Sequence, residues 1–303
     1  MANPELVRLA AGPFTAELCP EIGGSLTRFQ GWGIDLMRPA HPDALAARDP
    51  LGMSCYLLIP FSNRVGDARF TFEGRTYELA HNFAREPNAI HGNAWQRAWR
   101  LETATATTTR LTLSHDPGRD DAAAWPFAYH AALEAALDAD GLILRLMVEN
   151  TDARRMPLGL GLHPFFPLTA ATRLTARLGG VWLNSERMLP ERHVPVPPVW
   201  DFSHGAPAAP LKVDNCFTGW DGTAVLEWPE RRTAMTIAAA DLRNLVVYVP
   251  TAHDYVCVEP VSNVNDGFNL AAAGVADTGV TVLEPGEKKA ASVRFRPRQI
   301  SRA

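Results

Sequence analysis

The chain has 303 residues, of which 47% are hydrophobic and 20% are charged, and its formal net charge is −4 at pH 7. This composition is typical of a soluble globular protein, and no apolar run approaches the roughly 20 residues that span a bilayer. The charges are spread along the chain without a basic run to neutralise a nucleic-acid backbone, so neither a membrane nor nucleic acid is expected as a partner.

The cysteines and the first residues favour the cytoplasm. Cys19, Cys55, Cys216 and Cys257 are far apart and form no CxxC pair. This spacing argues against a structural zinc site and fits buried free thiols in a reducing compartment. The opening MANPELVRLAAG lacks the basic segment and apolar core of a secretory signal. We therefore expect a cytoplasmic protein.

Short alternating segments separated by turn residues recur along the chain and predict strands. Residues 14–18 alternate, and the chain after Phe29 turns through residues 31–33. Residues 69–79 form a predicted hairpin with its turn at Glu73 and Gly74. Further strands are predicted within 98–116 and at 173–178, 224–228, 234–237, 245–249, 255–258, 280–283 and 291–295.

Residues 129–150, YHAALEAALDADGLILRLMVEN, fit two structures. The alanine content up to Leu137 favours a helix by propensity, whereas the spacing of apolar residues also fits a strand. Alternate residues are apolar after the turn at Asp140 and Gly141. A pair of antiparallel strands is therefore the simpler prediction.

The only predicted helix is the short segment 41–49, HPDALAARD. The proline-rich residues 189–215 are expected to form a long irregular excursion, and loops of that length are usually functional. No shift in composition divides the chain, so we predict a single domain over residues 1–303. Many short strands between 22 glycines and 24 prolines predict an all-β fold, a sandwich of large antiparallel sheets.

Glu259 comes directly after the apolar run 255–258 and directly before Pro260. Because proline has no N–H to donate, we expect the strand to end here and to present the carboxylate from a rigid scaffold. The alternative is a solvent-exposed glutamate at the rim of a sheet, since most glutamates are exposed.

Four more polar clusters stand beside apolar runs: Asn63 with Arg64, His91 with Trp95, His163 before Pro164, and Asp214 near Trp220. Each has an ordinary structural alternative. A lone histidine beside apolar residues is more often a core or rim residue than a catalyst. An arginine is commonly a surface charge, an aspartate before asparagine commonly caps a turn, and a tryptophan commonly fills the core.

Other combinations of these residues suggest other chemistry. Asp214 and Glu259 resemble a glycosidase pair, but that interpretation leaves both histidines without a role. His91, His163 and a carboxylate suggest a metal site, but no HxxxH or HxxE spacing supports it.

Together the motifs resemble the aldose 1-epimerase family, also called galactose mutarotases. The likeness lies in NR at 63–64, IHG at 90–92 followed by Trp95, HPFF at 163–166, VDN at 213–215, and CVEP around Glu259 with DGFN downstream. These motifs follow the family's order from about residue 57 to residue 295. The resemblance implies a galactose mutarotase-like supersandwich that interconverts the α and β anomers of an aldose without a metal or organic cofactor.

The resemblance also implies residue roles. Glu259 corresponds to the general base that takes the proton of the C1 hydroxyl, and His163 to the general acid that protonates the ring oxygen. The residues expected to hold the sugar are Arg64, His91, Asp214, Asn63 and Trp95, with Phe165 and Trp220 as further aromatic surfaces. Each acid or base typically contributes about 10²- to 10⁴-fold. We expect mutual attraction to keep Glu259 ionised and His163 protonated near neutral pH.

Two alternatives share the same fold. A mutarotase of hexose 6-phosphates would need extra cations, for which Arg187 and Arg192 are candidates. A carbohydrate-binding or sensing module would bind sugar without turnover, but the presence of both Glu259 and His163 counts against it. The expected partner is a small sugar, and the protein is expected to be a monomer or a homodimer.

Overall fold

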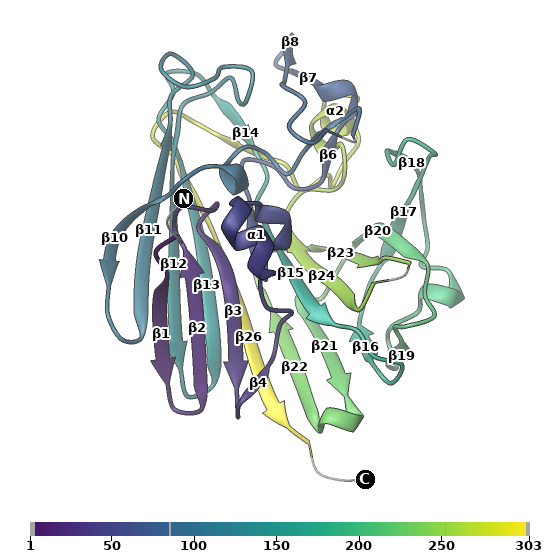
Figure 1. Ribbon diagram of the computed structural model, residues 1–303. Coiled ribbons are helices and arrows are strands. Elements are labelled where there is room, and N and C mark those ends of the chain that lie inside the picture. The colour runs from purple at the N-terminus through teal and green to yellow at the C-terminus, as the bar shows by residue number, and fades with distance from the viewer. Residues whose placement is uncertain (1–3, 85, 252, 301–303) are drawn as a thin grey trace.

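The computed structural model describes residues 4–84, 86–251 and 253–300. Most of the regular structure there is strand, arranged as two large antiparallel sheets (Figure 1). One hydrophobic core joins them, with Leu9 and Phe29 contributed by the first sheet and Leu133 and Phe295 by the second. The predicted all-β sandwich is confirmed.

The first sheet has eleven strands in the order β1-β2-β3-β5-β15-β24-β23-β20-β17-β18, with β4 paired to β3. Its strands are β1 (Val7–Ala11), β2 (Phe14–Cys19), β3 (Ser25–Gly31), β4 (Ile34–Asp35), β5 (Cys55–Leu58), β15 (Gly161–Pro167), β17 (Gly180–Asn184), β18 (Pro190–Val194), β20 (Val213–Thr218), β23 (Asn244–Val249) and β24 (Tyr255–Val261).

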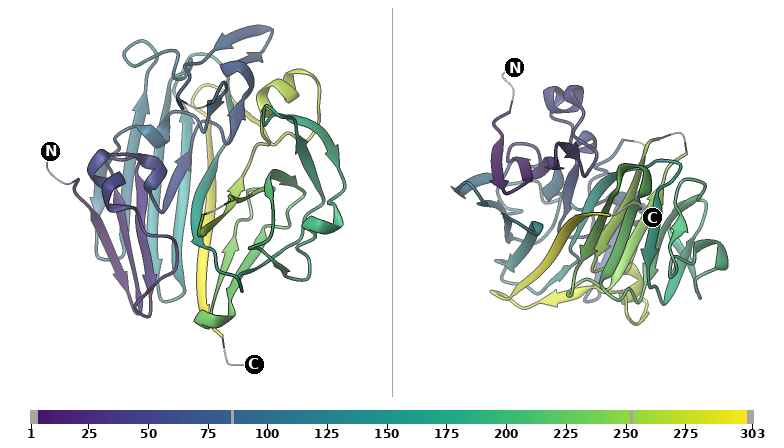
Figure 2. Two further views of the ribbon diagram at one scale, coloured as in Figure 1. Left: turned by 45° about the vertical axis from the view of Figure 1, so that its right-hand side comes forward. Right: turned by 90° about the horizontal axis from the view of Figure 1, so that it is seen from below.

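The second sheet has nine strands in the order β10-β11-β12-β13-β26-β22-β21-β16-β19. Its strands are β10 (Arg100–Ala104), β11 (Thr108–His115), β12 (Tyr129–Asp138), β13 (Gly141–Asn150), β16 (Arg173–Ala176), β19 (Ala206–Pro207), β21 (Thr223–Trp228), β22 (Thr233–Ala238) and β26 (Lys288–Gln299). The C-terminal strand β26 pairs with both β13 and β22, and Figure 2 shows it in yellow between the teal and green strands.

Three short pairs of strands and several short helices make up the remaining regular structure of the described residues. The pairs are β6 (Arg64–Val65) with β9 (Ala89–Ile90), β7 (Arg69–Phe72) with β8 (Arg75–Glu78), and β14 (Met156–Leu158) with β25 (Thr281–Leu283). The helices are α1 (Pro42–Ala47) and α2 (Gly267–Ala272), with 3-10 turns η1 (Pro50–Gly52), η2 (Gly66–Ala68), η3 (Ala94–Gln96), η4 (Pro198–Trp200) and η5 (Pro229–Arg231).

The ambiguous segment 129–150 forms the hairpin β12 and β13, in register from Tyr129 opposite Asn150 to Asp138 opposite Gly141. Alternate side chains of β12 from Tyr129 to Leu137 are buried. Burial of this face outweighs the helix propensity of the alanines, because packing routinely overrides propensity. The strand prediction is confirmed here.

The prediction of a single helix is wrong, because α2 is a second one beside β6 and β7 (Figure 1). Its sequence begins with a glycine, and Asp266 makes no side-chain cap, so the usual start signals are weak. The helix is fixed by packing instead. The ring of Phe268 lies 5.2 Å from that of Phe70 and 5.7 Å from that of Trp125, measured between centroids.

The predicted irregular excursion at 189–215 is wrong in part. Within it β18 pairs with β17 at the edge of the first sheet, and β19 pairs with β16 at the edge of the second. The segment therefore crosses from one sheet to the other. Edge strands tolerate proline, which has no N–H to donate, and this explains how a proline-rich segment still forms strands.

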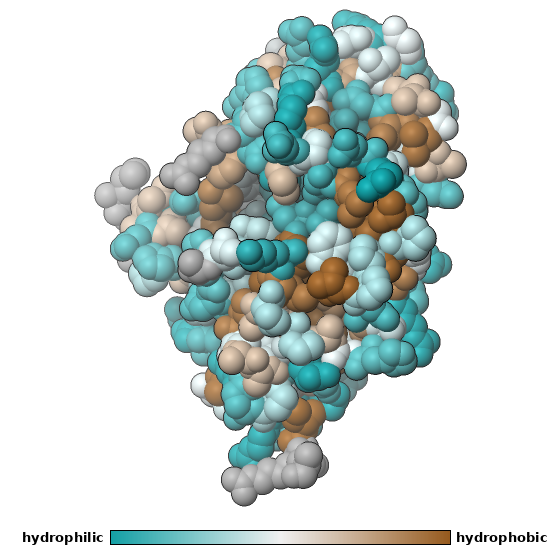
Figure 3. Space-filling view, turned by 90° about the vertical axis from the view of Figure 1, so that its right-hand side faces the viewer, coloured by the Kyte–Doolittle hydropathy of each residue, from teal (hydrophilic) through white to brown (hydrophobic). Residues whose placement is uncertain are grey.

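All four cysteines are buried free thiols, as their spacing predicted, and the face of the molecule in Figure 3 is mostly hydrophilic. In the part of the chain that is described, no helix has the length and apolar character needed to cross a membrane. Figure 3 shows hydrophilic side chains over most of the face that carries the right-hand side of Figure 1, with hydrophobic groups gathered toward its middle.

Candidate active site

The floor of the candidate site is a row of side chains across five neighbouring strands of the first sheet. Tyr56 of β5 lies opposite His163 of β15, and Glu259 of β24 lies opposite Val246 of β23. The pairs on either side of His163 and Glu259 share one register, which places these two residues opposite each other. Cys216 of β20, opposite Val246, ends the row.

His163 and Glu259 occupy a gap in the ladder between β15 and β24. Each is followed by a proline, Pro164 and Pro260, and proline supplies no backbone N–H. The side chains approach each other there, with His163 Nε2 3.3 Å from Glu259 Oε1. The expected end of the strand at Glu259 is wrong, because β24 continues through Pro260 to Val261. The proline interrupts the ladder locally without ending the strand.

One wall of the site comes from the chain around the short pair β6 and β9. Asn63 and His91 have φ angles of 59° and 62°, in the left-handed region that non-glycine residues rarely adopt. They bond reciprocally: the His91 N–H donates to the Asn63 carbonyl at 2.8 Å, and the Asn63 N–H donates to His91 Nδ1 at 3.2 Å. This geometry turns both side chains toward the floor of the site.

The bond to Nδ1 fixes the tautomer of His91. Because Nδ1 accepts, the neutral ring carries its proton on Nε2 and can donate there. Burial, followed by the nearby His163 and Arg64, moves the pKa of His91 well below its ordinary value. His91 is therefore a neutral hydrogen-bond donor.

The floor and wall enclose a cavity of about 380 Å³. All seven predicted site residues line it: Asn63, Arg64, His91, Trp95, His163, Asp214 and Glu259. Lining residues that the sequence did not single out include Tyr56, Phe83, Tyr248 and Tyr255. Tyr56 stands in an apolar run like any core strand, and only the register with His163 reveals its place.

Of the other aromatic and cationic candidates, only Phe165 lines the cavity. Its ring is stacked on His163 with centroids 4.6 Å apart. The suggestion that Trp220 packs on the sugar is wrong, because Trp220 is 1% exposed and its indole N–H donates to the Thr223 carbonyl. Arg187 pairs with Asp67, and neither it nor Arg192 is among the residues that line the cavity.

Burial opposes the charges expected on the central pair. It lowers the pKa of His163 to about 3. It raises the pKa of Glu259 well above its ordinary value, helped by the charge of Asp214 and opposed by that of Arg64. Burial therefore favours the uncharged form of each side chain, a protonated Glu259 and a neutral His163. This bias runs against the ionised Glu259 and protonated His163 expected from their mutual attraction, and those charged forms stay a prediction for the cavity with a sugar bound.

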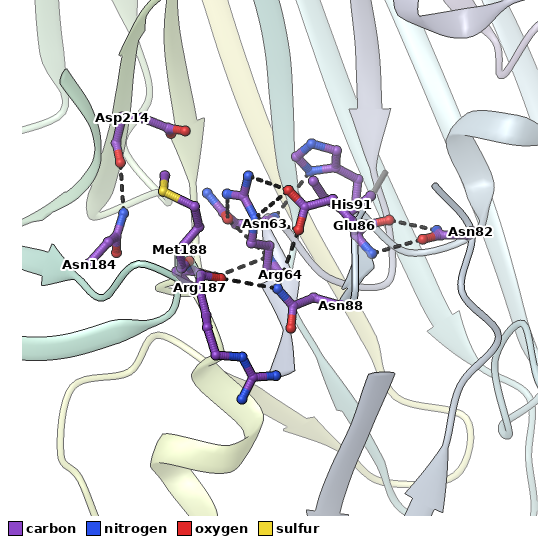
Figure 4. A network of polar contacts seen from close by, with 12 residues as sticks. Asn63, Arg64, Asn82, Glu86, Asn88, His91, Asn184, Arg187, Met188 and Asp214 are labelled. Carbon is purple, nitrogen blue, oxygen red and sulfur yellow. Dashed lines mark hydrogen bonds and ion pairs between the residues drawn. The ribbon is translucent and has the colours of Figure 1, made fainter. Parts of the chain in front are cut away.

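Asp214 and Arg64, both labelled in Figure 4, are two further charged groups that line the cavity. Burial raises the pKa of Asp214, and the positive charge of Arg64 works against that rise. Among the described residues no side chain donates a hydrogen bond to the carboxylate of Asp214, so this group can accept from a ligand. Arg64 donates to Glu86 at 2.8 Å and to Asn63 Oδ1 at 3.2 Å.

One trio in the site has metal-ligand atoms close together. Atoms of His163, Cys257 and Glu259 lie within 4.8 Å of one another. Burial raises the pKa of Cys257 well above its ordinary value, so its thiol is protonated, whereas a metal binds the thiolate. The donor set fits proton transfer between His163 and Glu259 better than it fits a cation.

Comparison with known proteins gives a consistent result. A family model described as aldose 1-epimerase matches residues 5–296. The uncharacterized protein YphB of Escherichia coli K12 is 31% identical over 285 residues, which cover 90% of this chain and 92% of YphB. The uncharacterized protein YihR of the same organism is 29% identical over 162 residues, which cover 53% of this chain and 50% of YihR.

Solved structures share the fold over almost the whole chain. A crystal structure from Escherichia coli K12, assigned provisionally as an aldose 1-epimerase, has a TM-score of 0.88 at 27% identity and covers 98% of this chain and 99% of that one. A galactose mutarotase-like protein from Clostridium acetobutylicum has a TM-score of 0.85 at 19% identity, covering 97% and 95% of the two chains.

Proposed function

We propose, since this chain belongs to the aldose 1-epimerase family, that it interconverts the α and β anomers of a hexose by general acid and base catalysis. The observation that carries the proposal is the pair of His163 Nε2 and Glu259 Oε1, 3.3 Å apart on the floor of the cavity. Two proton-transfer groups at this separation suit a reaction that moves protons at two oxygens on one carbon.

Each residue of the pair has one step in ring opening. The Glu259 carboxylate takes the proton of the O1 hydroxyl, and the electron pair of that O–H bond forms the C1=O1 double bond. The C1–O5 bond breaks, and O5 takes a proton from His163 Nε2. After rotation about C1–C2 the roles reverse, and O5 attacks the other face of C1. Both groups return to their starting state, so the reaction needs no net proton.

The resting pair differs from the reactive pair only in the position of one proton. Before sugar binds, burial favours the arrangement with that proton on Glu259. Hydrogen bonds from sugar hydroxyls to the carboxylate favour its ionised form. Transfer of the proton to His163 then creates the base and the acid together, without exchange with bulk water.

The surrounding groups can hold the sugar hydroxyls. His91 Nε2–H donates, and the Asp214 carboxylate accepts. The rings of Phe165 and Tyr56 offer apolar surfaces beside His163, with centroids 4.6 and 4.5 Å from that of the imidazole and 5.8 Å from each other. The site thus combines a few convergent polar groups with aromatic walls, which is typical of small-molecule pockets.

Anomer exchange measured by NMR tests the proposal. We expect the protein to accelerate exchange between the anomers of galactose or glucose above the spontaneous rate, and the acceleration to saturate with sugar. Binding of these sugars without any acceleration would point to a sensing module. Release of nitrophenol from nitrophenyl hexosides would instead point to a glycosidase that uses Asp214 and Glu259.

A further inference from the structure

Glu86, which the sequence motifs do not include, forms the main contact of Arg64 (Figure 4). Arg64 Nε lies 3.1 Å from both carboxylate oxygens of Glu86, and Nη2 donates to Oε1 at 2.8 Å. Both side chains are largely buried, at 12% exposure for Arg64 and 15% for Glu86. An arginine and a carboxylate in this two-pronged, shielded geometry form one of the stronger ion pairs in proteins.

Glu86 is itself fixed from the other side. Asn88 Nδ2 lies 3.3 Å from Glu86 Oε2 and 3.3 Å from the Arg187 carbonyl oxygen, and Asn88 is fully buried. Asn82 bonds the backbone of Ile90 in both directions and so ties this loop to β9. The carboxylate of Glu86 is therefore fixed by its own neighbours, and it in turn fixes the position of the Arg64 guanidinium.

The ion pair leaves Arg64 with limited capacity for a ligand. A guanidinium has five N–H donors, and Glu86 and Asn63 take three of them, so two remain. These two donors suit neutral sugar hydroxyls. Burial works to lower the pKa of Arg64, but the bonds to Glu86 and the charge of Asp214 outweigh it, so the pKa is raised.

The charges around the cavity disfavour an anionic ligand. Among the described residues that line it, Arg64 is the only lysine or arginine, and it faces the carboxyl groups of Glu86, Asp214 and Glu259. Arg38 lies nearby, but its guanidinium covers the Phe165 ring at 4.0 Å and donates to the Met53 carbonyl. A phosphate or carboxylate would lose its hydration, and Arg64, the cation that it would meet on the cavity lining, is already paired with Glu86.

We propose that Glu86 is a specificity-determining residue that restricts the cavity to uncharged aldoses, by holding Arg64 in place and cancelling its charge. This inference rests on the proposed function of the same site. It predicts that the protein discriminates against hexuronates and hexose 6-phosphates, and that the discrimination weakens when Glu86 loses its charge.

The test compares Glu86→Gln with the natural protein on galactose, galacturonate and galactose 6-phosphate, by anomer exchange in NMR. Glutamine still accepts a hydrogen bond from Arg64 but leaves its charge unbalanced. We expect kcat/KM to rise about tenfold for the anionic sugars, which corresponds to about 1.4 kcal/mol. For galactose we expect KM to rise with little change in kcat, because Arg64 becomes less well fixed. Glu102→Gln is the matched control, since Glu102 pairs with Arg110 on an exposed part of β10.

The outcomes separate the possible roles of Glu86. Equal losses on neutral and anionic sugars would show a structural role and overturn the proposal, and so would a natural protein that handles galacturonate as well as galactose. Glu86→Asp, which keeps the charge, is expected to keep the discrimination. If no sugar shows accelerated exchange, the proposed function fails, and saturation-transfer NMR still measures binding. Stronger galacturonate binding by Glu86→Gln would then support the role of Glu86, and unchanged binding would overturn it.

Discussion

His163 lies directly opposite Glu259 on the neighbouring strand, and each is followed by a proline that supplies no N–H to the ladder between them. Backbone bonds on both sides keep the two strands in register: the Ser262 N–H donates to the Leu160 carbonyl, and the Leu168 N–H to the Asp254 carbonyl. The catalytic pair proposed for this site is therefore positioned by the sheet itself, which fixes both side chains more firmly than a loop would.

Glu259→Gln removes the basic oxygen and keeps the shape of the side chain. We expect the fold and the affinity for galactose to survive while turnover falls by about 10³-fold or more, which corresponds to about 4 kcal/mol of barrier. Exchange measured by NMR at saturating sugar, corrected for the spontaneous rate, checks this. A variant that keeps more than about a tenth of the turnover would make Glu259 a binding residue and Asp214 the next candidate for the base.

His163→Asn removes the group that we propose protonates the ring oxygen. Because the transition state uses this proton and the bound sugar does not, we expect kcat to fall by about 10²-fold or more while binding stays within a few fold. Isothermal titration and NMR exchange measure the two quantities. Near-normal turnover would move the acid role to His91. The hydrogen bond from the Asn63 N–H to His91 Nδ1 favours the neutral ring, which is a much weaker acid than the imidazolium.

The raised pKa of Glu259 makes stability depend on pH. In the unfolded chain this carboxyl ionises near its ordinary value of 4.5, whereas the folded state keeps it protonated to higher pH. Its contribution is thus fully present below that ordinary value and is lost as pH rises toward the folded-state pKa. The loss has a slope of up to about 1.4 kcal/mol per pH unit.

Urea unfolding of the natural protein and of Glu259→Gln from about pH 5 to pH 8 checks this dependence. The stability of the natural protein should fall relative to the variant as pH rises, because the variant has no carboxyl to titrate at this position. The other titratable or charged groups around Glu259 are common to both proteins and include His91, His163, Arg64, Asp214, Cys55, Cys216, Cys257 and Tyr56. Parallel stability curves would show that the folded state does not hold this proton.

Gly92 connects His91 to the rest of the wall, and its own conformation requires glycine. Its φ is +70°, and an added Cβ would lie 2.1 Å from the Ile59 carbonyl oxygen, which accepts hydrogen bonds from Asn93 and Ala94. Gly74 is a matched control, with φ +74° and nothing within 4 Å of an added Cβ. We expect Gly74→Ala to cost about 1 kcal/mol and Gly92→Ala about 2 to 3 kcal/mol more. Equal free energies of unfolding for the Gly92→Ala and Gly74→Ala variants would mean that the backbone at Ile59 can move away from the added methyl group.

Sequence patterns predicted most of the fold because burial on one face of a strand leaves a period of two, as residues 129–150 show. They failed where long-range packing decided the structure. The short helix α2 lacks good start signals and is fixed by Phe268 among distant aromatic rings. The strands β18 and β19 are short edge strands among prolines, so they leave little pattern.

Sequence motifs identified residues of the candidate site but not their arrangement in space. Motifs identified His163 and Glu259, but not that they lie opposite each other inside two strands, since register is a property of the sheet. Tyr56 and Glu86 gave no signal, because one stands in a core-like apolar run and the other in a polar loop. The sequence also does not reveal the extent of burial, which favours the uncharged forms of His163 and Glu259.

The position of β26 has a consequence for biosynthesis. This strand follows all the other described strands in the chain, yet it joins β13 to β22 and so connects the two halves of the second sheet. Until residues 288–299 emerge, β13 and β22 each present an unpaired edge, which is a template for wrong pairing with another chain. Folding of this sheet therefore has to wait for residues 288–299, and a chain truncated before residue 288 is expected to be prone to aggregation.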